Sequence, residues 1–217
     1  MSKTTAMTKK TFEQYDAEHV IVYFNESESE MPAMQEGENG QTVYQYDTVK
    51  VKCDTVSVDA IKQALVENGY NADEAEAIAA GVMLQAVQDG TVEGDALELA
   101  KQMVVARITA YDKSDAVNEF TYGGVPMWLD KATRAGLQLR LSAEAAASHE
   151  NTTLWLDTQS FTLPVASAQQ MLVALELYAS ACFDRTESHK AAVKAKRSVN
   201  TVLSYDYTAD YPEKLAF

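Results

Sequence analysis

Residues 120–130, Phe-Thr-Tyr-Gly-Gly-Val-Pro-Met-Trp-Leu-Asp, carry the clearest structural signal in the chain. Gly123-Gly124 separates two short apolar and aromatic runs, and both glycines tolerate a positive φ, so the pattern predicts a β-hairpin with a two-residue turn. Pro126 has no amide proton, which places the second run at a sheet edge or a bulge. Asp130 is a favourable N-cap, and the Ala- and Leu-rich residues after it predict a helix through Ala147.

A second hairpin and a long helix follow in the sequence. Residues 152–156 and 160–163 are typical of strands, and residues 157–159 form the turn between them. Ser167 and Gln170 match a capping box. One apolar face with i, i+4, i+7 and i+11 spacing then predicts a helix through Met171, Leu175, Tyr178 and Cys182.

The N-terminal residues predict a small β module. Residues 1–10 are polar and are expected to form a mobile tail, whereas residues 19–24 and 42–51 are typical of two antiparallel strands. Residues 25–40 contain five glutamates and no basic residue, so we expect a solvated acidic loop between the strands.

The middle of the chain has helical periodicity. Three helices are predicted, from Ser57 to Asn68, from Asn71 to Asp89 and from about Asp95 to about Tyr111. The fold class is therefore α+β, with a small N-terminal β module at residues 1–56, a helical connector at 57–113, and a C-terminal module at 114–217 that holds two β-hairpins and two helices, the last one long.

Charge and hydropathy exclude several classes of partner. The chain has 217 residues, with 18 Lys+Arg against 32 Asp+Glu, which gives a formal net charge of −14. Such a protein repels phosphate backbones, so we expect no nucleic acid or anionic membrane surface as a partner. No run approaches the ~20 apolar residues of a membrane-spanning helix, and no cleaved export signal is expected.

The sequence offers no motif for catalysis or metal binding. The three histidines, His19, His149 and His189, have no Cys within helical or strand reach and form no HExxH or HxH motif, and no phosphate-binding glycine loop or nucleophile elbow is present. The carboxylates between Glu26 and Glu38 lack the EF-hand spacing. We therefore expect no enzymatic activity, catalytic residue, cofactor or metal, and two reduced thiols at Cys53 and Cys182.

Aromatic and apolar residues near the C-terminus are the candidate interaction surface. Trp128 and Trp155 lie on separate hairpins, where packing is the ordinary role, although an exposed pair suits carbohydrate stacking or a protein hot spot. Beyond Phe183 the long helix becomes mainly polar and basic, so its remaining apolar residues are expected to meet either solvent or another subunit. These are Val193, Val199, Val202 and Leu203, with Tyr205, Tyr207 and Tyr211 folding back or reaching a neighbour.

Several of these motifs together resemble a known family. The runs AVNEFTYGGVPMWL (116–129), RAGLQ (134–138), TTLWL (152–156), SFTLPV (160–165) and YASACFD (178–184), with YDY (205–207) and YPEKL (211–215), resemble a domain of unknown function common in phage and prophage proteins. Members tend to be encoded among tail genes, and some resemble tail-fibre assembly proteins. The resemblance supplies no catalytic residues.

The resemblance implies a non-enzymatic phage or prophage tail-region protein, either a structural or adaptor component of the virion tail or a tail-fibre assembly helper. Its expected partners are other phage tail proteins and copies of itself. Its expected location is the virion tail, or the bacterial host cytoplasm during assembly. The first alternative is a module that binds a glycan or a host surface, and the second is an uncharacterised enzyme.

Overall fold

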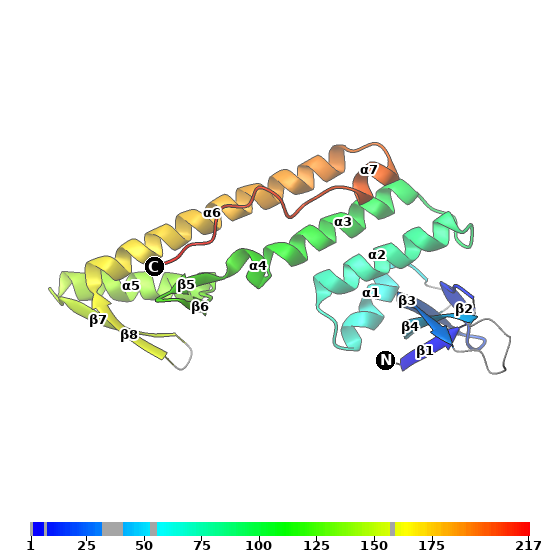
Figure 1. Cartoon of the computed structure of the whole chain (residues 1–217), viewed down its shortest axis with the longest axis horizontal. Helices are drawn as coiled ribbons and strands as arrows, with labels where there is room; N and C mark the ends of the chain where they lie inside the picture. The colour runs from blue at the N-terminus through cyan, green and yellow to red at the C-terminus, as the bar shows by residue number, and fades with distance from the viewer. Residues whose placement is uncertain (1, 7, 32–40, 53–55, 157–158) are drawn as a thin grey trace. The chain divides into compact units, whose positions relative to one another are not determined.

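The computed structural model describes residues 2–6, 8–31, 41–52, 56–156 and 159–217 (Figure 1). The chain is mixed α+β, as predicted, and forms two compact units. Unit 1 comprises residues 1–107 and 192–205, and unit 2 comprises residues 108–191 and 206–217. Two of the three boundaries, at 107/108 and 191/192, fall inside helices. Whether the segments 1–56, 57–113 and 114–217 fold separately remains a prediction.

The sheet of unit 1 has four antiparallel strands in the order β1-β4-β3-β2. The strands are β1 (Ser2–Ala6), β2 (Phe12–Gln14), β3 (His19–Met31) and β4 (Gln41–Lys52). The predicted central pair is confirmed, whereas the expected mobile tail is wrong because β1 pairs with β4. Main-chain hydrogen bonds hold this edge strand in the sheet. Its sequence therefore lacks the apolar alternation that predicts a strand.

The acidic loop is also shorter than expected. Strand β3 continues through residues 25–31 and pairs with the start of β4, after a bulge between Phe24 and Ser27. Asn25 has a left-handed φ of 53° at this bulge, a conformation that Asn tolerates better than most residues. The glutamates of this segment are exposed, so the strand keeps them in water. Residues 32–40 of the expected loop lie outside the described residues.

Two helices complete the core of unit 1. Helices α1 (Val58–Glu67) and α2 (Ala72–Gln88) begin at the predicted N-caps Ser57 and Asn71. Their apolar faces pack on Val22, Phe24, Val49 and Val51 of the sheet through residues such as Ile61, Leu65, Ala79 and Met83. The core of unit 1 therefore combines the predicted β module with part of the predicted connector. Helix α3 (Ala96–Asp112) follows, as predicted.

Unit 2 contains both predicted hairpins. After the short helix α4 (Asp115–Asn118), strands β5 (Phe120–Tyr122) and β6 (Val125–Met127) pair across Gly123 and Gly124, whose φ values are 57° and 81°. Helix α5 (Lys131–Ala146) is capped by Asp130, which accepts a hydrogen bond from the Thr133 amide at 2.8 Å. Strands β7 (Asn151–Leu156) and β8 (Gln159–Pro164) form the second hairpin.

The long helix α6 (Val165–Ala195) starts two residues before the predicted cap at Ser167. Val165 is buried and its amide donates to the Glu150 carbonyl at 3.0 Å, so the helix follows β8 without an intervening loop. The core of unit 2 joins the hairpins to α5 and α6 through residues such as Phe120, Leu141, Leu154 and Leu172. A short helix α7 (Val199–Leu203), not predicted from the sequence, lies in unit 1.

The C-terminal tail of unit 2 adds to the first hairpin. The Thr121 amide donates to the Leu215 carbonyl at 3.0 Å, and the Thr121 carbonyl accepts from the Phe217 amide at 2.9 Å. These bonds form an isolated parallel bridge between Thr121 and Ala216. The tail therefore covers one edge of β5, and in Figure 1 it runs back beside α6 to reach that place.

Candidate functional site

Aromatic residues of the tail fold back onto α3 and α6 in unit 2. The Tyr111 ring makes edge contacts with the rings of Tyr207 and Tyr211, at centroid distances of 5.9 and 5.4 Å. The His189 ring stacks on Tyr211 at 5.6 Å. The sequence left open whether Tyr207 and Tyr211 fold back or reach a neighbour. In the structure, both fold back and pack against their own chain. We call Tyr111, Thr186, His189, Tyr207 and Tyr211 the tyrosine cluster.

A chain of hydroxyl groups runs through the tyrosine cluster. Thr186, which is 1% exposed, donates its hydroxyl proton to Asp112 Oδ1 at 2.7 Å, and its oxygen lies 2.8 Å from the Tyr211 hydroxyl. A hydroxyl has only one proton to give, so Tyr211 must donate to Thr186. His189 Nε2 lies 3.0 Å from the Ala209 carbonyl oxygen, and Arg185 forms an ion pair with Asp210. The polar atoms under the tail are therefore paired with it.

Burial changes the acidity of nearby groups. It raises the pKa of Tyr211 and the pKa of Cys182, and it raises the pKa of Tyr178 strongly. The Tyr178 hydroxyl donates to the Val117 carbonyl at 2.7 Å, which holds the phenol in its neutral form. Cys182 is a free thiol, and with a raised pKa it is mostly protonated at neutral pH and is a poor nucleophile. These groups stabilise the fold.

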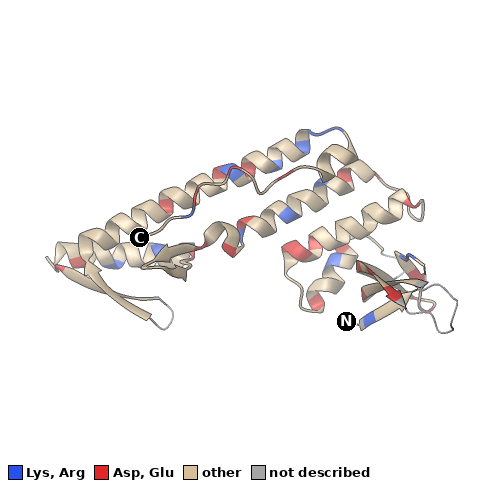
Figure 2. Ribbon diagram, viewed as in Figure 1, with Lys and Arg blue, Asp and Glu red and all other residues tan. Residues whose placement is uncertain are grey.

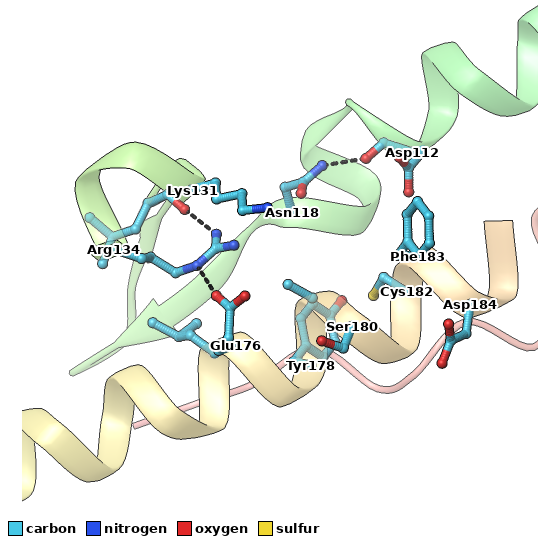
Figure 3. A pocket seen from close by; sticks show the side chains of 13 residues that line it. Asp112, Asn118, Lys131, Arg134, Glu176, Tyr178, Ser180, Cys182, Phe183 and Asp184 are labelled. Carbon is cyan, nitrogen blue, oxygen red and sulfur yellow. Dashed lines mark hydrogen bonds and ion pairs between the residues drawn. The ribbon is translucent and has the colours of Figure 1, made fainter. Parts of the chain in front are cut away.

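A pocket of about 500 Å³ opens beside the cluster, between α6 and the segment from α4 to the start of α5 (Figure 3). Its walls include Leu129, Leu175 and Ala179, and its lining also includes charged residues. The volume is within the usual range of ligand sites. The pocket therefore combines an apolar wall with charged groups.

The pocket has two cationic side chains, Arg134 and Lys131, in different environments. Arg134 Nε donates to Glu176 Oε2 at 3.1 Å and its Nη1 donates to the Leu129 carbonyl at 2.6 Å, so this guanidinium is occupied within the chain. Lys131 is exposed and points toward Asn118 in Figure 3. Among the described residues, no group of three or more His, Cys, Asp or Glu side chains is arranged to hold a metal ion.

The remaining candidate residues have different environments. Trp128 is 47% exposed and Trp155 is 68% exposed, so both rings are available on the surface. Val193 and Val202 are fully buried, and the expectation that they contact a partner is wrong. The polar sequence around them favours a contact with a partner, although the chain itself covers both side chains.

Three further candidates lie near the end of α6 and in α7. Val199 is half-buried, and Leu203 remains exposed at 44%. The Tyr205 ring accepts a cation–π contact from Lys196, whose Nζ lies 4.8 Å from the ring centroid. Tyr205 therefore folds back onto its own chain within unit 1.

The structure shows an apolar surface that the sequence reasoning missed. Of the ten large exposed hydrophobic residues in the described chain, seven lie in unit 2. Four of them were not singled out, namely Leu139 of α5 at 75% exposed and Val173, Leu177 and Phe183 of α6 at 52%, 68% and 59%. Val173 and Leu177 are four residues apart, which places them on one helix face. The sequence contains that spacing, but the face that includes Met171 and Leu175 has more apolar residues at helical spacing and was predicted in its place.

A comparison with protein families matches the part of the chain that contains the pocket. A model of a domain of unknown function, DUF4376, matches residues 99–209, which is more than half of the chain. The chain therefore belongs to this family. All residues that line the pocket lie within the matched segment. The description of the family gives no function, so the expected association with phage tails stays a prediction.

No curated protein and no solved structure matches the chain. In the described part of the chain, no helix combines the length and the apolar character that crossing a membrane requires.

Proposed function

We propose that this protein is a non-enzymatic tail-region protein of a phage or prophage, either a structural or adaptor component of the virion tail or a helper in tail-fibre assembly. The resemblance of the C-terminal motifs to phage and prophage proteins supports the phage context. Two exposed apolar residues on one face of α6, Val173 and Leu177, support a role in protein–protein contact, because neighbouring exposed apolar side chains mark interaction sites.

The observation that carries the proposal is the exposed face of α6. Val173 and Leu177 are more than half exposed on this face, and Ser180 continues it by one turn. Moving a Val or Leu side chain fully from water into an interface contributes about 1.5–3 kcal/mol. Two such residues are enough to form the centre of a small protein interface.

The pocket offers a second point of attachment on the same helix. Glu176, Ala179 and Phe183 line it, and Phe183 remains 59% exposed. A partner that covers Val173 and Leu177 can therefore place one of its own side chains in the pocket. Interfaces commonly combine an apolar patch with a pocket that accepts an anchor residue.

The expected partners are other tail proteins of the same phage. A net charge of −14 disfavours nucleic acid and anionic membranes as partners. Self-association is also expected, because the resemblance implies a tail component and such components are generally built with rotational symmetry. Since Val193 and Val202 are buried, the exposed face of α6 replaces them as the contact between copies. The protein is expected in the virion tail, or in the bacterial host cytoplasm during assembly.

Deleting the gene from the phage or induced prophage that carries it tests this function. We expect particles with defective tails or fibres, and restoration by the intact gene. Mass spectrometry of purified particles then separates the two roles, since a structural component is present in them and an assembly helper is absent. Normal tails, normal adsorption and no association with any tail protein would contradict both roles.

The alternative of a glycan or host-surface module is favoured by a different observation, the exposed ring of Trp155 on the second hairpin. A tail component can carry such a module in addition to its contacts with other tail proteins.

A further inference from the structure

The hairpin β7–β8 has two faces of different character. Thr152, Leu154 and Leu163 are buried, and the two leucines lie in the core of unit 2. Arg140 fastens β7 to α5, since its Nη2 donates to the Thr152 hydroxyl at 3.0 Å and to the Thr153 carbonyl at 2.9 Å. The inner face is therefore fixed to the rest of the unit, and the outer face is held rigidly by it.

The outer face is formed by three cross-strand pairs. The register places Asn151 opposite Pro164, Thr153 opposite Thr162, and Trp155 opposite Ser160. Five of these residues are exposed and Thr153 is half-buried. The Thr153 and Thr162 hydroxyl oxygens lie 2.9 Å apart, which aligns the centre of the face. Four residues along a strand span about 13 Å, so the face has the length of a short oligosaccharide.

The outer face is polar but carries no charged residue. The chain has a net charge of −14, yet neither strand of the hairpin carries a charged residue, and both appear uncharged in Figure 2. Exposed strands ordinarily carry charged side chains, which prevent aggregation at their edges. Here hydroxyl groups and one amide surround a ring that is 68% exposed.

We propose that the outer face of the β7–β8 hairpin binds a neutral oligosaccharide. The face of the Trp155 ring is electron-rich and suits the weakly positive C–H groups on one side of a sugar ring. The Ser160, Thr162 and Asn151 side chains both donate and accept hydrogen bonds, as sugar hydroxyls require. The absence of charge on the face matches a neutral sugar and disfavours an acidic one. The proposal deepens the glycan alternative given above and rests on it, whereas the contact of α6 with a tail protein is tested separately.

Fluorescence titration of the full chain tests the proposal. In a Trp128→Phe background, Trp155 is the sole tryptophan, and the probes are cellotriose, maltotriose and triacetylchitotriose, with sialyllactose as an acidic comparison. We expect at least one neutral trisaccharide to shift the emission and to bind more tightly than sialyllactose. No response to any of the three neutral sugars would overturn the proposal.

Variants of the outer face locate the binding, with affinities measured by calorimetry for the neutral trisaccharide that binds. Trp155→Ala is expected to weaken binding by about tenfold or more, whereas Trp155→Phe retains most of it. Thr162→Val, which removes one hydroxyl, is expected to weaken binding by several-fold. Trp128→Ala is the matched control on the other hairpin and is expected to bind as the parent does. Equal affinity in Trp155→Ala and the parent would overturn the proposal.

Two outcomes separate this inference from the proposed function. If Trp155→Ala loses the sugar but still enters particles or supports fibre assembly, both ideas hold independently. If Trp155→Ala binds sugar like the parent and instead loses a tail protein, the outer face is a protein site and the oligosaccharide proposal is wrong.

Discussion

At the scale of single residues, Tyr211 connects the tail to α6. Its hydroxyl donates to Thr186 and its ring stacks on His189. Thr186 keeps its bond to Asp112 whatever happens to Tyr211. The tail is therefore held by a hydrogen bond and by ring contacts, which substitutions can separate.

The substitution Tyr211→Phe removes the hydroxyl and keeps the ring. We expect it to lower the free energy of unfolding by about 1 kcal/mol, because one buried hydrogen bond is lost. Tyr211→Ala should cost about 3 kcal/mol or more, since the ring packing is also lost. Urea denaturation followed by circular dichroism measures both. Tyr15→Phe, at a tyrosine that is 61% exposed, is the control, and equal losses at positions 15 and 211 would contradict the expectation.

A second residue-scale prediction concerns pH. Burial, together with the hydrogen bond that its hydroxyl donates to Glu13, raises the pKa of Tyr23 from 10.0 to about 12. Above pH 10 the unfolded chain loses this proton while the folded chain keeps it, so the folded state binds the proton more tightly. The stabilisation is therefore complete below about pH 10 and falls as the pH rises toward 12.

Denaturation at a series of pH values from about 8 to about 11 tests this sign. The parent is expected to lose stability more steeply above pH 10 than Tyr23→Phe, which has no phenol proton to lose. Identical slopes for the parent and Tyr23→Phe would show that Tyr23 does not carry the effect.

At the scale of elements, the turn between β5 and β6 depends on two left-handed residues. Gly123 and Gly124 have positive φ, and a Cβ added at either meets no atom within 4 Å. The cost of a side chain there is therefore conformational. We expect Gly123→Asn to be tolerated, because Asn adopts this conformation readily, and Gly124→Val to destabilise by roughly 1–2 kcal/mol.

Gly136 is the control for this prediction, because it lies inside α5 with no positive φ and no atom within 4 Å of an added Cβ. Gly136→Ala is expected to stabilise by up to about 1 kcal/mol, as Ala is the better helix former. Urea denaturation ranks the three variants. A Gly124→Val protein as stable as the parent would argue against the strained turn.

Elements with a strong local signal were predictable from the sequence. The caps at Ser57, Asn71 and Asp130 and the turn at Gly123 use side chains or backbone freedom within a few residues, so their pattern is visible without the fold. Strand β1 and the extension of β3 were not predictable, because polar strands are stabilised by pairing with β4, a contact distant in sequence.

The candidate site was predicted less well, for a related reason. Trp128 and Trp155 were identified, but their exposure depends on which face of each hairpin meets the core. Val193 and Val202 were predicted to contact a partner, because the residues that cover them are not local in sequence. Val173 and Leu177 were overlooked because α6 has apolar residues on more than one face, and periodicity alone does not show which face is covered.

At the scale of the whole molecule, the two units have separate cores. Leu65 belongs to the core of unit 1 and Leu154 to that of unit 2, and each is at most 1% exposed. We expect more than one transition in calorimetry, since units with their own cores can unfold separately. Leu65→Ala and Leu154→Ala, each costing about 2–5 kcal/mol, should shift different transitions. A single transition that both variants shift equally would indicate one cooperative domain.

The central claim is that unit 2 binds a tail protein through the exposed face of α6. The most direct measurement is co-purification of the tagged full chain with the tail proteins of the phage that carries its gene, quantified by mass spectrometry. The claim predicts that a tail protein co-purifies with the parent and is lost with Val173→Lys/Leu177→Lys. It also predicts that the tail protein is retained by Val66→Lys, which adds one positive charge at a residue of unit 1 that is 41% exposed. Equal recovery with all three proteins, or no tail protein with any of them, would contradict the claim.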